Sequence, residues 1–103
     1  MVQFPNSPAT EETMRRCLVL WILLENQSRS MPGTEISNRV PAMIRKKFGS
    51  TSDYVWPGIK GTDSAFEDME YHGLIVGSVF TSWSATQKGK DYLESAEARF
   101  LPA

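Results

Sequence analysis

The chain is poor in the residues that disulfides and metal sites require. It has one cysteine, Cys17, and one histidine, His72, among 103 residues. A single cysteine cannot form an internal disulfide, so we expect a reducing, cytoplasmic location. A single histidine excludes a metal site built on a histidine pair, and Cys17 falls among apolar residues, as core cysteines do. The sequence therefore predicts no metal site, no cofactor and no enzymatic activity.

Long hydrophobic runs are also missing. The longest apolar run extends from Cys17 to Leu24, well short of the roughly 18 residues that cross a bilayer. Arg15 and Arg16 precede this run in the manner of a signal peptide, but acidic residues lie upstream and no small-residue cleavage site follows. We expect no membrane association.

Positive charge is not in surplus. Eleven Lys and Arg residues are outnumbered by twelve Asp and Glu residues, which gives a net charge of -1. Because neutralisation of phosphates supplies much of the affinity for DNA, a DNA-binding function would need its cations gathered on one face. The length and the 41% hydrophobic content suit one domain with one core. We place it at residues 10–100, after a flexible arm at residues 1–9.

Two helices are predicted before residue 50. The first runs from a cap at Thr10 to about Asn26 and is apolar almost all the way round. Such a helix is buried on more than one side, against the C-terminal helix or a dimer partner. The second begins at Thr34 and ends near Phe48. Pro41 interrupts it, which predicts a kink or two short helices.

Residues 50–100 predict a loop, a helix, a hairpin and a last helix. The loop covers residues 50–61, and the third helix starts at Thr62 or Ser64 and stops at Gly73. Strands follow at residues 74–76 and 79–85, joined by a type II′ turn at Gly77-Ser78. A last helix starts at Thr86 and reaches about Phe100. The fold class is α+β and mostly α, with a three-helix core, a β-hairpin and a C-terminal helix.

Two segments carry a resemblance to a known family. They are Met69-x-x-x-Gly73-Leu74-Ile75 and the run SATQKGKDYL from Ser84 to Leu93, together with Val55-Trp56-Pro57 before the third helix. With these, residues 34–95 resemble the winged helix-turn-helix transcriptional regulators of the PadR and MarR kind. The resemblance implies a winged-helix domain whose third helix enters the major groove of DNA.

Charge on the third helix departs from that family. Its exposed positions are predicted to be polar or acidic and without Lys or Arg: Asp63, Ser64, Glu67, Asp68, Glu70 and Tyr71. From Gly73 to Gln87 there is no charged residue at all. Cations lie instead at the end of the second helix, before the third helix and after the hairpin. Those of the second helix, together with Lys60, are predicted to border one rim facing the groove.

Two functions remain open from the sequence. The first is a small winged-helix DNA-binding protein, a transcriptional regulator that dimerises through its first and last helices and binds double-stranded DNA. Its predicted DNA-binding residues are Arg39, Arg45, Lys46, Lys47, Lys60, Thr62, Asp63, Ser64, Glu67, Ser78, Lys88 and Lys90. The alternative is a protein-protein interaction module, of the kind found in phage inhibitors or adaptors, which would bind a protein partner through its acidic third helix and uncharged wing.

Overall fold

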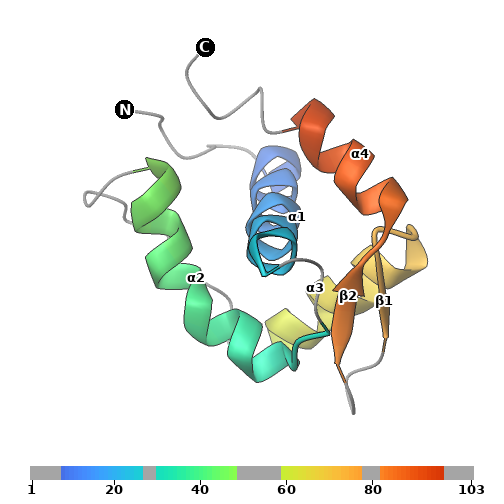
Figure 1. Cartoon of the computed structure of the whole chain (residues 1–103), viewed down its shortest axis with the longest axis horizontal. Helices are drawn as coiled ribbons and strands as arrows, with labels where there is room; N and C mark the ends of the chain where they lie inside the picture. Colours follow the sequence, from blue (N-terminus) through green and yellow to red (C-terminus); the bar gives the residue numbers. More distant parts are fainter. Residues whose placement is uncertain (1–7, 27–29, 49–58, 78–81, 97–103) are drawn as a thin grey trace.

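Four α-helices and one two-stranded antiparallel sheet form the described part of the chain (Figure 1). The structure is a computed structural model that describes residues 8–26, 30–48, 59–77 and 82–96, with side chains at 12–26, 30–47, 64–77 and 82–96. The elements are α1 (Pro8–Glu25), α2 (Gly33–Phe48), α3 (Ile59–Tyr71), β1 (Ile75–Gly77), β2 (Trp83–Ala85) and α4 (Gln87–Ala96). The predicted class, α+β and mostly α, is confirmed.

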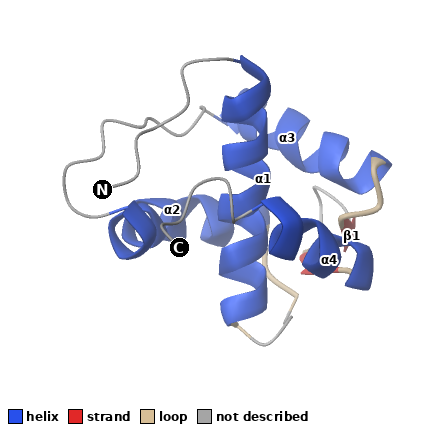
Figure 2. Ribbon diagram, turned by 90° about the horizontal axis from the view of Figure 1, so that it is seen from above, coloured by secondary structure: helices blue, strands red, loops and turns tan. Residues whose placement is uncertain are grey.

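Helix α1 lies at the centre of the molecule, with the other elements around it (Figures 1 and 2). Met14 and every residue from Cys17 to Leu23 are buried, none more than 4% exposed. The helices α2, α3 and α4 and the strand β2 all pack against it. The predicted burial of the first helix on more than one side is therefore confirmed, and the elements that bury it belong to the same chain.

A backbone bridge joins the segment before α2 to the hairpin. The Met31 N–H donates to the Trp83 carbonyl and the Trp83 N–H donates to the Met31 carbonyl, each at 2.9 Å. On its other edge β2 pairs with β1, with Val76 opposite Ser84. The Trp83 ring is buried and packs against Phe66 of α3, with centroids 5.7 Å apart. This arrangement fixes the starts of α2 and β2 and the middle of α3 against one another.

Helices α2 and α3 differ from their predicted forms. Pro41 lies inside one continuous helix, and the prediction of two short helices is wrong. Its ring is on the exposed side, where the missing N–H costs one helical hydrogen bond without breaking the helix. Helix α3 begins at Ile59, earlier than the predicted start at Thr62 or Ser64. Its last residue is Tyr71, and the predicted terminating glycine, Gly73, follows two residues later and donates its N–H to the Glu70 carbonyl at 2.9 Å.

The hairpin register corrects the predicted two-residue turn. Gly77 pairs with Trp83, so five residues, 78–82, separate the paired positions. Gly77 has a φ of 143°, and a Cβ there would lie 1.9 Å from the Ser82 carbonyl oxygen. Glycine is therefore required by the strand itself. The predicted strand residues 79–81 and the turn residue Ser78 lie outside the described residues.

Helix α4 starts where the sequence predicts. The Thr86 hydroxyl accepts a hydrogen bond from the Gly89 N–H at 3.0 Å, which caps the helix, and donates to the Gly73 carbonyl at 2.6 Å. Gly89 is buried against β1, and a Cβ there would lie 2.1 Å from the Leu74 carbonyl oxygen. The missing side chain lets α4 approach the hairpin closely. The predicted extension over residues 97–100 lies outside the described residues.

Candidate nucleic-acid interface

The solvent side of α3, here called the α3 face, consists of four exposed residues: Ser64, Glu67, Glu70 and Tyr71. Phe66 and Met69 are buried on the opposite side of the helix, as predicted. Because a helix repeats every 3.6 residues, Ser64, Glu67 and Tyr71 follow one another along a single line. Tyr71 is 86% exposed at the end of that line. Among the described side chains, the α3 face carries two carboxylates and no Lys or Arg.

Asp68 does not belong to the α3 face, which corrects the sequence prediction. Its carboxylate turns towards α1, where Oδ2 accepts a hydrogen bond from Arg16 Nη2 at 2.8 Å. The other oxygen, Oδ1, lies 3.4 Å from Nε2 of His72, which is half-exposed. The Asp68 side chain therefore points towards α1, although 37% of it remains exposed. The negative charge available to a ligand on α3 is correspondingly smaller.

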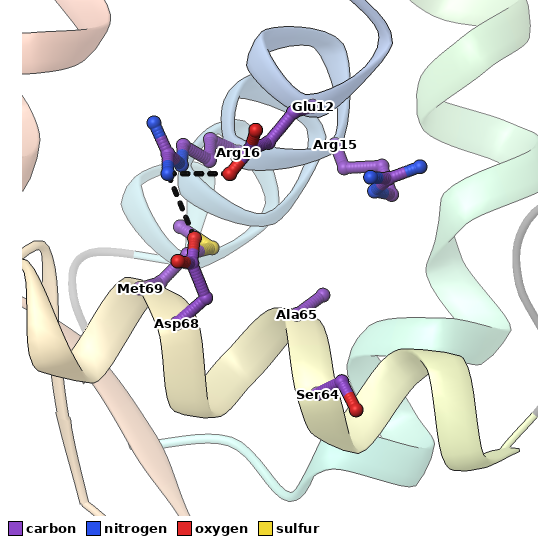
Figure 3. A pocket seen from close by; sticks show the side chains of 7 residues that line it. All are labelled: Glu12, Arg15, Arg16, Ser64, Ala65, Asp68 and Met69. Carbon is purple, nitrogen blue, oxygen red and sulfur yellow. Dashed lines mark hydrogen bonds and ion pairs between the residues drawn. The ribbon is translucent and has the colours of Figure 1, made fainter. Parts of the chain in front are cut away.

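Arg16 holds Asp68 and also contacts α1 and α4. Its Nη2 donates to Glu12 Oε1 at 2.7 Å as well as to Asp68 (Figure 3). Its guanidinium carbon lies 5.8 Å from the centre of the Tyr92 ring. Burial lowers the pKa of Arg16, but hydrogen bonds to Asp68 and Tyr92 and the two nearby carboxylates outweigh it, so the pKa is raised. Arg16 therefore stays charged inside a contact of three helices.

A groove of about 510 Å³ runs between α1 and α3 beside this contact (Figure 3). Arg15 and Arg16 line the α1 side, and the α3 side includes Ser64 and Ala65. The Arg15 side chain points away from the Arg16 contact in this view. Two arginines and two carboxylates line the groove, so their formal charges balance.

Three of the four cations predicted on α2 have a described partner within the molecule. Nη2 of Arg39 lies 2.9 Å from Glu35 Oε1, and Lys46 Nζ lies 2.9 Å from Glu25 Oε1 of α1. Nζ of Lys47 lies over the Trp21 ring, 5.1 Å from its centre. These exposed ion pairs contribute little to stability. They do reduce the free positive charge that α2 presents.

Most of these cations also lie far from α3. Helix α2 begins beside α3, where Gly33 contacts Phe66, and runs away from it (Figures 1 and 2). At about 1.5 Å per residue, the basic end around Arg45 is roughly 18 Å along the helix from Gly33. Arg45 is exposed there. The structure does not bring Arg45, Lys46 and Lys47 to the α3 face.

Lys88 is the predicted cation that the described residues bring next to α3. Its Nζ lies 3.8 Å from the position that a Cβ would take on Gly73, at the C-terminal end of α3. Lys90 is exposed on α4 and borders a second groove with Leu24 and Thr86. Both lysines therefore lie at the base of the hairpin. The side chains of Lys60, Thr62 and Asp63, and all of Ser78, lie outside the described residues.

Sequence reasoning missed two residues of this region. It left Met31 between the first two predicted helices without a role in the core, whereas Met31 is 4% exposed and paired with Trp83. It treated Arg16 only as a flank of the apolar run. A usable signal for Arg16 was its position within a helix that is otherwise buried, with Glu12 four residues earlier as an ion-pair partner.

Neither a metal centre nor a membrane segment is found in the described ranges. No group of three or more His, Cys, Asp or Glu side chains gathers there, and no described helix combines the length and apolarity that crossing a bilayer demands. Comparison of the chain with protein-family models, curated proteins and solved structures gives no significant match.

Proposed function

We propose that the chain is a winged helix-turn-helix protein in which β1 and β2 form the wing. The bridge between Met31 and Trp83 supports this assignment, because it ties the segment before the second helix to the second strand of the hairpin. The order of helix, bridge, two helices, hairpin and helix is the other support. In this fold, the third helix is the element that enters a DNA groove.

We infer that the protein binds double-stranded DNA as a small transcriptional regulator. The observation that carries this proposal is the α3 face, which is exposed and offers a hydroxyl, carboxylates and a phenol on a helix anchored from behind by Phe66. A carboxylate such as that of Glu67 accepts hydrogen bonds from cytosine amino groups. Lys88 and Lys90, with Lys60 before them in the chain, are the proposed phosphate contacts.

A mobility-shift assay with a mixed-sequence duplex at low salt tests this proposal. DNA binding predicts a shifted species that disappears as salt is raised, because bound counterions are released from the phosphates. Absence of any shifted species at low salt would contradict it. A variant with Tyr71→Ala on the α3 face is the matched test of the surface, since its side chain is exposed and its loss leaves the core intact.

The second candidate is a protein-interaction module, and the charge of the α3 face favours it. Glu67 and Glu70 are exposed with no basic side chain beside them on the described part of that face, so a Lys- or Arg-rich protein partner would be attracted where DNA is repelled. Substituting both with Lys separates the candidates. Stronger binding of the mixed-sequence duplex supports the DNA-binding function, because two repulsive charges become attractive, whereas lost binding of a basic protein partner supports the interaction module.

The homodimer predicted from the sequence stays a proposal. Its rationale was the apolar circumference of the first helix, and those residues are buried within the single chain. The α4 residues that remain exposed are polar: Gln87, Lys88, Lys90, Asp91, Glu94 and Ser95. A dimer through α4 would therefore have a polar interface, and sedimentation equilibrium decides between monomer and dimer.

A further inference from the structure

Arg16 interacts with a side chain of each of three helices. It bonds Glu12 on its own helix and Asp68 on α3, and it interacts with Tyr92 on α4 through a hydrogen bond and the ring face. Only 18% of its side chain is exposed. Asp68 and Tyr92 are thus connected through one guanidinium, although they belong to different helices.

The energetics of a partly buried guanidinium limit the arrangements that it tolerates. Its Nε is buried and has no hydrogen-bond partner in the described part of the molecule, so the remaining bonds must compensate for the lost hydration. If α4 shifts and Tyr92 moves, Arg16 must find a new position relative to Asp68. A displacement of one helix is therefore opposed by the other.

Asp68 is well placed to pass such a displacement to the α3 face. It lies four residues after Ser64 and three before Tyr71, so it is a direct neighbour of both, on the edge of the α3 face that adjoins α1. Any rotation of α3 that follows Asp68 reorients both residues. The same carboxylate also approaches His72 at the end of the helix.

We propose that Arg16 is a positioning residue that couples the placement of α3 to that of α4. A ligand or partner that moves α4 would change the orientation of the α3 face through Arg16. The coupling is a property of the free protein and is measured without DNA. A role of this coupling in regulation rests on the proposed function.

A double-mutant cycle in the unfolding equilibrium constant tests the coupling. Tyr92→Phe removes the hydroxyl and keeps the ring, and Asp68→Asn removes the charge. In the parent chain, we expect the unfolding equilibrium constant of the double mutant to differ at least about twofold from the value obtained by multiplying the fold-changes of the two single substitutions. In the Arg16→Met background, we expect the two fold-changes to multiply. As the matched control, the fold-changes caused by Glu35→Gln on α2 and by Asp68→Asn should multiply, because the ion pair of Glu35 with Arg39 does not touch α3.

Two results would overturn the proposal: simple multiplication in the parent chain, or coupling that persists without Arg16. If Arg16→Met does not fold, Arg16→Lys serves instead, because lysine keeps the charge but has one nitrogen for all partners. Arg16→Lys should at least halve the deviation of the double mutant from simple multiplication.

Hydrogen exchange adds a readout that local packing of Tyr92 would not change. Tyr92→Phe should accelerate exchange in α3 more than in α2, and equal acceleration in both contradicts the coupling.

The DNA assay separates this proposal from the function on which its biological purpose rests. Absence of thermodynamic coupling in a chain that binds DNA refutes the role of Arg16 alone. Intact coupling in a chain that binds no DNA refutes the DNA-binding function alone and leaves the positioning role of Arg16 in place.

Discussion

Met31 and Trp83 exchange two backbone hydrogen bonds of 2.9 Å, which joins residues 52 positions apart in the chain. The pair does more than extend the hairpin. It places the start of α2 beside the sheet and buries the Trp83 indole against Phe66 of α3. The orientation of the α3 face therefore depends on a contact that involves none of its own residues.

Truncation of Trp83 should be among the most damaging single changes. Trp83→Ala removes a side chain that is 1% exposed, and a fully buried aromatic costs about 3–5 kcal/mol when it is replaced by alanine. Trp83→Phe should cost less, because the buried indole Nε1 has no hydrogen-bond partner among the described residues and its loss removes an unsatisfied polar group. Urea unfolding of both variants checks this order. Equal losses would contradict close packing of the Trp83 ring, because phenylalanine leaves a smaller cavity than alanine.

Replacement of Gly89 should separate α4 from the hairpin. In Gly89→Ala, the new Cβ would lie 2.1 Å from the Leu74 carbonyl oxygen and 2.9 Å from Leu20 Cδ2. Relief of this overlap requires backbone movement, at a cost of about 1–3 kcal/mol. Ser95→Ala, on the exposed side of the same helix, is the control and should change stability by less than about 0.5 kcal/mol. Similar thermal midpoints for the two variants would contradict the close approach.

Neutralisation of Lys88 should weaken DNA binding, whereas neutralisation of Lys46 should not. Lys88 lies beside the C-terminal end of α3, and Lys46 pairs with Glu25 away from it. If Lys88 contacts one phosphate, Lys88→Gln reduces the slope of log K against log salt by about 0.9. Fluorescence anisotropy over a salt series measures both slopes. A larger loss for Lys46→Gln would move the interface to the basic end of α2.

The contribution of Arg16 to stability should not change with pH in the neutral and mildly alkaline range. Its pKa is raised above the ordinary arginine value, so the stabilisation is complete below the pKa of the unfolded chain, which is itself strongly alkaline, and is lost only when pH rises through the still higher folded pKa. The difference in unfolding free energy between the parent chain and Arg16→Met should therefore be constant from pH 7.5 to 9.5. A difference that shrinks across this range would show that another group carries the effect.

Local signals predicted much of the fold. The apolar circumference of the first helix predicted its central position, and Gly73 and Thr86 marked a helix end and a helix start that the structure confirms. The hairpin register was predicted wrongly because Gly77-Ser78 resembles a two-residue turn, while the strand needs glycine at Gly77 for its φ of 143°. Local turn preference did not reveal the long-range pairing of Gly77 with Trp83.

The candidate site was harder to predict because it depends on which helix ends meet. Helical spacing left Asp68 on a side that was taken as solvent, since nothing in the sequence indicates that Arg16 of α1 lies opposite. The basic end of α2 was expected next to α3 for a similar reason. The direction of α2 relative to α3 is a tertiary property, and charge counts along the chain do not contain it.

Binding of a mixed-sequence duplex, measured by fluorescence anisotropy over a series of salt concentrations, tests the proposed function most directly. Non-specific DNA binding at physiological salt is typically in the range of about 10⁻⁴ to 10⁻⁶ M. We expect saturable binding with a Kd below about 10⁻⁵ M at low salt, and a linear fall of log K with log salt whose slope corresponds to several phosphate contacts. No anisotropy change at about 10⁻⁴ M protein and low salt would contradict it.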